Sequence, residues 1–173
     1  AIASQLAGGR YETGQNQPSD LIRLVKEAAL AQTRLTTSRG ATLQVVLPDI
    51  PITLDQDQAT IRRLLDRMLT VVIACASTSE KVRLSVVPMQ NSYRIIASKP
   101  TRLGQASLRS IFDSVAVDGA SPPPELPLGV GFVFRLIDQL SRQCGGNLEL
   151  NASEITLNLP RESFSAKESR EPR

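Results

Sequence analysis

The sequence contains no histidine and no tryptophan, and aromatic residues make up only 3% of its 173 residues. Without histidine, these residues supply no imidazole that could act as a general base, a metal ligand or a phosphate acceptor. The scarcity of aromatic side chains leaves few platforms on which nucleic-acid bases could stack. The core is therefore expected to consist mainly of leucine, valine, isoleucine and alanine.

Charge and cysteine content argue against several further classes of function. The formal net charge is only +3, from 20 basic and 17 acidic residues, which is too small an excess to indicate nucleic acid as a partner. Cys75 and Cys144 lie far apart in the sequence, so neither a zinc site nor a disulfide framework is expected. No apolar run has the length of a membrane span, so direct membrane insertion is not expected. A reducing, cytoplasmic setting fits this composition, including that of the cytoplasmic part of a larger sensor.

Apolar spacing along the chain predicts four helices and five strands. Ser19 or Asp20 is a candidate N-cap for the first helix, and the helix after Asp57 has the clearest amphipathic pattern. The predicted order is helix 20–34, strand 42–48, helix 57–76, strands 81–88 and 92–98, helix 103–115, helix 131–142, and strands 147–150 and 155–160. This order predicts an α+β fold, a two-layer α/β sandwich in which helices cover one face of a mixed sheet.

The two ends of the chain differ in composition from the part between them. Residues 1–17 combine a short apolar stretch, ended by Gly8 and Gly9, with a polar connector; we interpret them as the end of a helix and a linker. Residues 18–160 carry the periodic pattern of one domain, whereas residues 161–173 are polar and charged, so a disordered tail is expected there.

Gly129 and Gly131 stand in the stretch LPLGVGFVFRLIDQL, directly before a run with helical apolar spacing. Backbone N–H groups at a helix start can bind a phosphate. Glycine is equally suited to a loop that enters a helix, because it tolerates unusual backbone conformations. A lone G-x-G motif often occurs without a ligand, so we favour the structural interpretation over phosphate binding. The preceding DGASPPPELP is expected to be an extended loop, because three consecutive prolines exclude regular structure.

The order of elements, the glycine pair and the later GG-x-L-x-L hairpin together resemble the catalytic and ATP-binding domain of bacterial sensor histidine kinases, of the GHKL ATPase superfamily. The resemblance covers roughly residues 18–160, and LAGGRYET resembles the end of the family's dimerisation helix and its linker. It implies a histidine-kinase-type ATPase fold and a role in two-component signalling. The implied partners are a response regulator or a partner kinase domain, and any homodimer would form through upstream helices outside this chain.

The family's nucleotide-binding positions mostly carry other residue types here. In the family, the helix predicted at 57–76 carries two asparagines and a lysine, and the second asparagine helps to hold Mg²⁺ against the nucleotide phosphates. Arg67, Val71 and Ala74 take these places, on one stripe beside the apolar face. Valine offers no oxygen to Mg²⁺ and alanine no charge to a phosphate, whereas Arg67 could contact a phosphate directly.

The adenine-binding motif of the family is altered as well. Its Asp-x-Gly corresponds to Ser98 and Pro100, and serine accepts a weaker hydrogen bond than an ionised carboxylate does. Gly129 and Gly131 resemble the family's second glycine motif. Arg67, Ser98, Gly129 and Gly131 are therefore the candidates for residual nucleotide contact, and we predict no catalytic residue and no metal ligand in this chain.

The losses fall on positions that would contact nucleotide and metal, while the core pattern stays intact. We therefore expect a pseudokinase-like signalling module that binds no cofactor, is not an enzyme, and acts by regulation or docking. Two alternatives stay open. The chain could be a working ATP-binding domain that uses Mg-ATP to phosphorylate a histidine outside these residues. It could instead belong to a histidine phosphotransferase that presents a surface to a response regulator.

Overall fold

The computed structural model describes residues 19–104, 107–113, 126 and 128–161. The predicted helix end and linker at 1–17 and nearly all of the predicted tail at 161–173 lie outside these residues. Most of the proline-rich loop lies outside them too.

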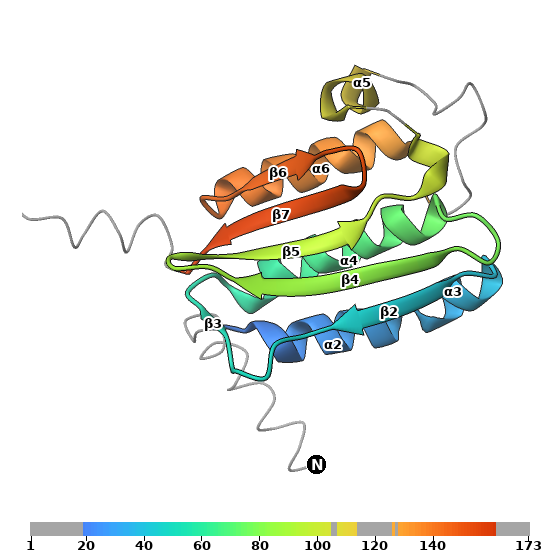
Figure 1. Ribbon diagram of the computed structural model, residues 1–173. Helices are drawn as coiled ribbons and strands as arrows, with labels where there is room; N and C mark the ends of the chain where they lie inside the picture. The colour runs from blue at the N-terminus through green and yellow to red at the C-terminus, as the bar shows by residue number, and fades with distance from the viewer. Residues whose placement is uncertain (1–18, 105–106, 114–125, 127, 162–173) are drawn as a thin grey trace, which may run out of the picture.

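Five strands form one mixed sheet in the order β2-β4-β5-β7-β6 (Figure 1). The edge strand β2 runs parallel to β4, and every other neighbouring pair is antiparallel. The hairpin predicted at 81–88 and 92–98 is confirmed, with Leu84 opposite Ala97. The strands are β2 (Thr42–Val46), β4 (Lys81–Pro88), β5 (Ser92–Ser98), β6 (Asn147–Leu150) and β7 (Glu154–Pro160).

Helices cover one face of this sheet, as the sequence predicts, and Figure 1 shows α2, α4 and α6 side by side behind the strands. No helix in the described part of the chain is both long and apolar enough to cross a membrane. The helices are α2 (Leu21–Ala31), α3 (Thr33–Ser38), α4 (Gln58–Ala74), α5 (Leu108–Asp113) and α6 (Val130–Gln143), with a 3₁₀ turn η1 (Thr101–Leu103).

The predicted N-cap of the first helix is confirmed, because the Asp20 side chain accepts a hydrogen bond from the N–H of Arg23 at 3.4 Å. The prediction of one continuous helix was wrong at Gln32, where the chain leaves helical geometry and then starts α3. The Thr33 hydroxyl donates to the carbonyl of Leu30 there. Such side-chain bonds compete with the helical ladder, which favours a break.

Two further details were not predicted. A small two-stranded ladder joins β1 (Ser19–Asp20) to β3 (Thr53–Leu54), where the sequence indicated only a helix cap and a turn-rich bridge. The helix predicted at 103–115 does not begin at Leu103, which ends η1; α5 begins at Leu108.

The core lies between the helical layer and the covered face of the sheet, and it is aliphatic as expected. Helix α4 contributes much of it, because its apolar residues recur at helical spacing and its first turn is capped by Asp57, which accepts from the N–H of Thr60 at 3.2 Å. Residues that are completely buried include Leu21, Leu54, Ile61, Leu64, Leu65, Met68, Leu84, Ile95, Phe134 and Leu157.

Candidate functional site

The resemblance places a nucleotide beside α4, the start of α6 and the end of β5. On α4, Val71 and Ala74 take the places of the family's asparagine and lysine. Both side chains are 0% exposed and belong to the hydrophobic core. Their backbone positions follow the predicted stripe, yet the side chains contact neighbouring apolar groups and leave no surface there for a phosphate or a cation.

Arg67 lies one turn before Val71 and lines a cavity of about 300 Å³ between α4 and the start of α6. The Nε atom of Arg67 is buried and has no hydrogen-bond partner among the described residues. The walls are mostly apolar and include Leu128 and Phe132, which are 69% and 43% exposed. The structure therefore brings Arg67 to the start of α6, as the resemblance requires of a nucleotide-contacting residue.

The polar groups that share this cavity are already engaged. The Asp66 carboxylate accepts from Nε of Arg62 at 3.0 Å. The Thr70 hydroxyl donates to the carbonyl of Asp66 at 2.6 Å and accepts from the Gln32 side chain at 3.3 Å. These contacts hold both side chains on the protein, although only one oxygen of the Asp66 carboxylate takes part in them.

Ser98 ends β5, where the family has its adenine-binding aspartate. Its Oγ accepts a hydrogen bond from the N–H of Arg83 on the neighbouring strand β4 at 2.9 Å. Ser98 is not among the residues that line the cavity beside Arg67. The structure thus uses this hydroxyl within the sheet and does not bring it together with Arg67.

The loop after β5 is fixed by a residue that the sequence analysis missed. The carboxylate of Glu80 accepts from the N–H of Ser77 at 2.8 Å, from the N–H of Thr101 at 3.1 Å and from the Thr101 hydroxyl at 3.2 Å. It therefore ties the end of α4 to the turn η1. The stretch Ser77-Thr78-Ser79-Glu80 has the spacing of a capping box, in which a glutamate satisfies the N–H three residues earlier, and this pattern could have identified it.

We predict that Glu80→Ala lowers the free energy of unfolding by about 1–2 kcal/mol, because it removes three hydrogen bonds to a charged acceptor, and water can replace only the two at exposed positions. Urea unfolding followed by far-UV circular dichroism measures the change. Glu154→Ala is the control, since Glu154 is an exposed strand residue and its loss should cost no more than about 0.5 kcal/mol. Equal effects of the two substitutions would contradict the assigned role.

The glycine pair occupies the start of α6, as predicted. Gly129 is the N-cap and has a φ of 95°, which favours glycine, and its N–H donates to the carbonyl of Leu126 at 2.8 Å. Gly131 lies buried in the first turn. No side chain among the described residues caps this helix, and N–H groups of a first turn have no partner within the helix. The conformation of Gly129 thus has a structural reason that requires no ligand, while the first-turn N–H groups remain able to bind an anion.

Both cysteines are buried free thiols. Burial raises the pKa of the Cys75 thiol from 9.0 to about 11, although Arg102 and Arg39 act in the opposite direction. Burial also raises the pKa of Cys144. Near neutral pH both groups are therefore protonated, and neither has the thiolate character of a nucleophile.

The raised pKa of Cys75 predicts a loss of stability at alkaline pH. In the unfolded chain the thiol releases its proton near pH 9, whereas the folded chain retains it up to about pH 11. Over that interval the free energy of unfolding should fall by about 1.4 kcal/mol per pH unit through this group. Urea unfolding from pH 8.5 to 11 measures it, and Cys75→Ala should show a shallower decline than the unchanged protein. If the free energy of unfolding falls with pH equally steeply in both proteins, the prediction is wrong.

Comparison with known proteins identifies the fold. No protein-family model matches the sequence, and no curated protein is significantly similar to it in sequence. Solved structures do match. The mycobacterial sensor histidine kinase MprB superposes with a TM-score of 0.63 at 13% identity, over 86% of this chain and 99% of that one. A histidine kinase from Burkholderia phymatum superposes with a TM-score of 0.64 at 17% identity, over 94% of this chain and 78% of that one.

Full-length ShkA in complex with AMPPNP gives a TM-score of 0.65 at 19% identity, over 84% of this chain but only 31% of that one. A structure described as the catalytic domain of the histidine kinase ThkA gives 0.61 at 13% identity and is covered over 95% of its length. These superpositions include the mixed five-stranded sheet and its helices in this chain, which the order of elements predicts. The chain therefore has the fold of the catalytic, ATP-binding domain of histidine kinases.

Proposed function

We propose that this chain is a signalling module of a two-component system, derived from the ATP-binding domain of a histidine kinase, that has lost nucleotide binding and acts by docking. The burial of Val71 and Ala74 carries this proposal, because both side chains are 0% exposed at the places where the family binds metal and phosphate. A working site needs polar side chains that face the ligand at these places. Here the same positions stabilise the core.

The residues present do not fit a Mg-nucleotide complex of the family's kind. Mg²⁺ requires a nearly octahedral set of oxygen ligands. Buried Val71 stands where the family's second asparagine helps to hold Mg²⁺ against the nucleotide phosphates, and valine offers no oxygen ligand. Asp66, the carboxylate beside Arg67, is paired with Arg62. These observations support a role without ATP turnover. The fold shared with histidine kinases supports the rest of the proposal, a cytoplasmic module that docks to a response regulator or a partner kinase domain.

One observation favours the alternative, a nucleotide-binding domain with unusual residues. The buried Nε of Arg67 lacks a partner in the described part of the chain, and the first-turn N–H groups of α6 start close by. An arginine and a helix N-terminus together can bind a phosphate. Full-length ShkA, of which this chain covers 31%, is described in complex with AMPPNP.

Phosphoryl transfer separates the two functions. The protein, in the longest form that its gene encodes, is incubated with γ-³²P-labelled ATP and Mg²⁺ beside an active histidine kinase as control. Under the proposal no label appears on the protein while the control becomes labelled. Label with the acid lability of phosphohistidine would overturn the proposal and establish the alternative.

A further inference from the structure

The described part of the sheet has two edges, and they are protected to different degrees. Edge strand β6 is short and carries the charged Glu149. Edge strand β2 has no charged residue, and its register with β4 runs without a bulge from Thr42 opposite Lys81 to Val46 opposite Ser85. Natural sheets usually protect an edge with charge, proline, a bulge or a covering element, since an open edge can pair with another strand. The β2 edge has none of these within the strand.

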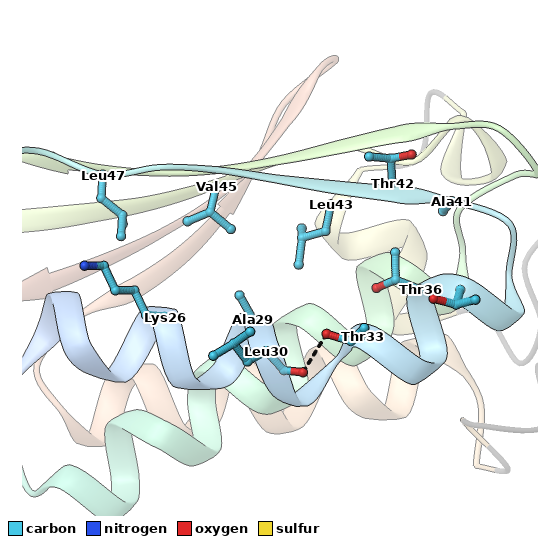
Figure 2. Close-up of a pocket in the computed structure, with 11 residues that line it drawn as sticks. Lys26, Ala29, Leu30, Thr33, Thr36, Ala41, Thr42, Leu43, Val45 and Leu47 are labelled. Carbon is cyan, nitrogen blue, oxygen red and sulfur yellow. Dashed lines mark hydrogen bonds between the residues drawn. The ribbon is translucent and has the colours of Figure 1, made fainter.

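A groove of about 660 Å³ runs along this open edge, between β2 above and helices α2 and α3 below (Figure 2). Leu43, Val45 and Leu47 point into it from the strand side. Ala29 and Leu30 line it from α2, and Leu30 is 74% exposed. The helical layer thus extends beyond the last strand and leaves an apolar shelf where one further strand would lie.

The same strand residues also direct their peptide groups outward. The N–H of Thr42 donates to the carbonyl of Glu80 on the β4 side at 2.9 Å. Successive residues of a strand turn both their side chains and their peptide groups to alternate sides. Leu43 and Val45 therefore direct their N–H and C=O groups to the open edge, while their side chains line the groove.

Charge identifies one more feature of the occupant. Lys26 is the only charged residue that lines the groove, and no ion pair of Lys26 is recorded among the described residues. Figure 2 places it on α2 near Leu47, at one end of the groove. An occupant with a carboxylate at that end would complement this ammonium group.

We propose that the β2 edge is a docking site for an extended segment of a protein partner, which adds to the sheet as an antiparallel strand. Alternate apolar side chains of the segment fill the groove, and an acidic side chain at its start pairs with Lys26. Backbone hydrogen bonds to Leu43 and Val45 supply affinity, and the groove supplies specificity. This site goes beyond the proposed function and is independent of the nucleotide question, so each can fail without the other.

The probe is an end-capped peptide of sequence Glu-Thr-Val-Thr-Val-Thr. In antiparallel pairing its glutamate and two valines lie opposite Leu47, Val45 and Leu43 in turn. Titration into the ¹⁵N-labelled protein should shift the amide signals of Leu43 and Val45 and slow their hydrogen exchange. No shift at millimolar peptide would overturn the proposal.

Two N-methylated forms of the peptide test strand pairing with a matched control. Methyl groups on the valine nitrogens block the N–H groups that face β2, so the dissociation constant should rise at least about tenfold. Methyl groups on the first two threonine nitrogens face away from β2 and should change the dissociation constant by no more than about twofold. If both N-methylated peptides have the same dissociation constant, the peptide fills the groove through its apolar side chains without pairing as a strand. That result would overturn the proposal.

Variants of the protein test the groove and its charge. Leu30→Ser should weaken binding of the peptide. Because the Leu30 side chain is exposed, this substitution should leave the fold intact. Lys26→Glu should also weaken binding of this peptide, and it should strengthen binding of a peptide that begins with lysine. Arg94→Glu, the same charge change on an exposed residue of β5, should have neither effect. A concentration-dependent dimer that protects the Leu43 and Val45 amides without peptide would assign the edge to a second copy of this chain and overturn the proposal.

Discussion

Replacing Val71 with asparagine, the residue type that the family has at this place, is expected to lower the free energy of unfolding by about 3 kcal/mol. The side chain is 0% exposed. The substitution removes buried apolar contacts and places an amide in the core without a hydrogen-bond partner, and each of these costs on the order of 1–3 kcal/mol. Urea unfolding followed by far-UV circular dichroism measures the loss, and we expect no gain of ATP binding.

The matched control is Arg67→Asn, which introduces the same residue type one turn earlier on the same stripe of α4. Arg67 is only partly buried and its Nε has no partner among the described residues, so the cost should stay below about 1 kcal/mol. If Val71→Asn is tolerated as well as Arg67→Asn, or gives the protein affinity for Mg-ATP, then Val71 faces an open site and our description of α4 is wrong.

Gly146→Ala is expected to lower the free energy of unfolding by about 3 kcal/mol or more. A Cβ atom at Gly146 would lie 1.9 Å from the carbonyl oxygen of Asn158 and 3.3 Å from Cα of Leu159. Both are backbone atoms of β7, so the clash cannot be relieved by a side-chain rotation and the β6–β7 hairpin must shift. The melting temperature and the urea midpoint should both fall strongly.

Gly104→Ala is the control for Gly146, because it separates crowding from backbone conformation. Gly104 has a φ of 56° and nothing within 4 Å of an added Cβ. Only the positive-φ backbone conformation (φ 56°, ψ −132°) opposes an alanine there, at a cost of about 1–3 kcal/mol. Equal losses at Gly146 and Gly104 would show that the close approach to Asn158 is relieved without cost.

The elements that the sequence predicted well are those whose signal is local and long. The hairpin at 81–88 and 92–98 alternates apolar and polar residues on both strands, and the structure has the same bounds. The ladder between β1 and β3 could not be predicted, because each strand is two residues long and its partner is distant in the sequence. The break at Gln32 depends on hydroxyl groups that bond locally, which an apolar pattern does not reveal.

In the candidate site, too, the sequence predicted the features that depend on local spacing and missed those that depend on tertiary packing. The positions of Arg67, Gly129 and Gly131 follow from helix spacing, and the structure places them at α4 and the start of α6. The burial of Val71 depends on neighbouring elements that cover the helix, so the sequence alone could not distinguish a stripe beside the core from one within it. The bond between Ser98 and the N–H of Arg83 depends on strand register for the same reason.

The loss of nucleotide binding is tested most directly by a thermal-shift measurement of this chain with ATP, ADP and AMPPNP, each with and without Mg²⁺. A ligand that binds only the folded state must raise the melting temperature by mass action. We predict no rise at millimolar nucleotide, with an active histidine kinase domain as positive control. A rise that requires Mg²⁺, and that Arg67→Ala abolishes, would contradict the account and would make Arg67 and the start of α6 a working phosphate site.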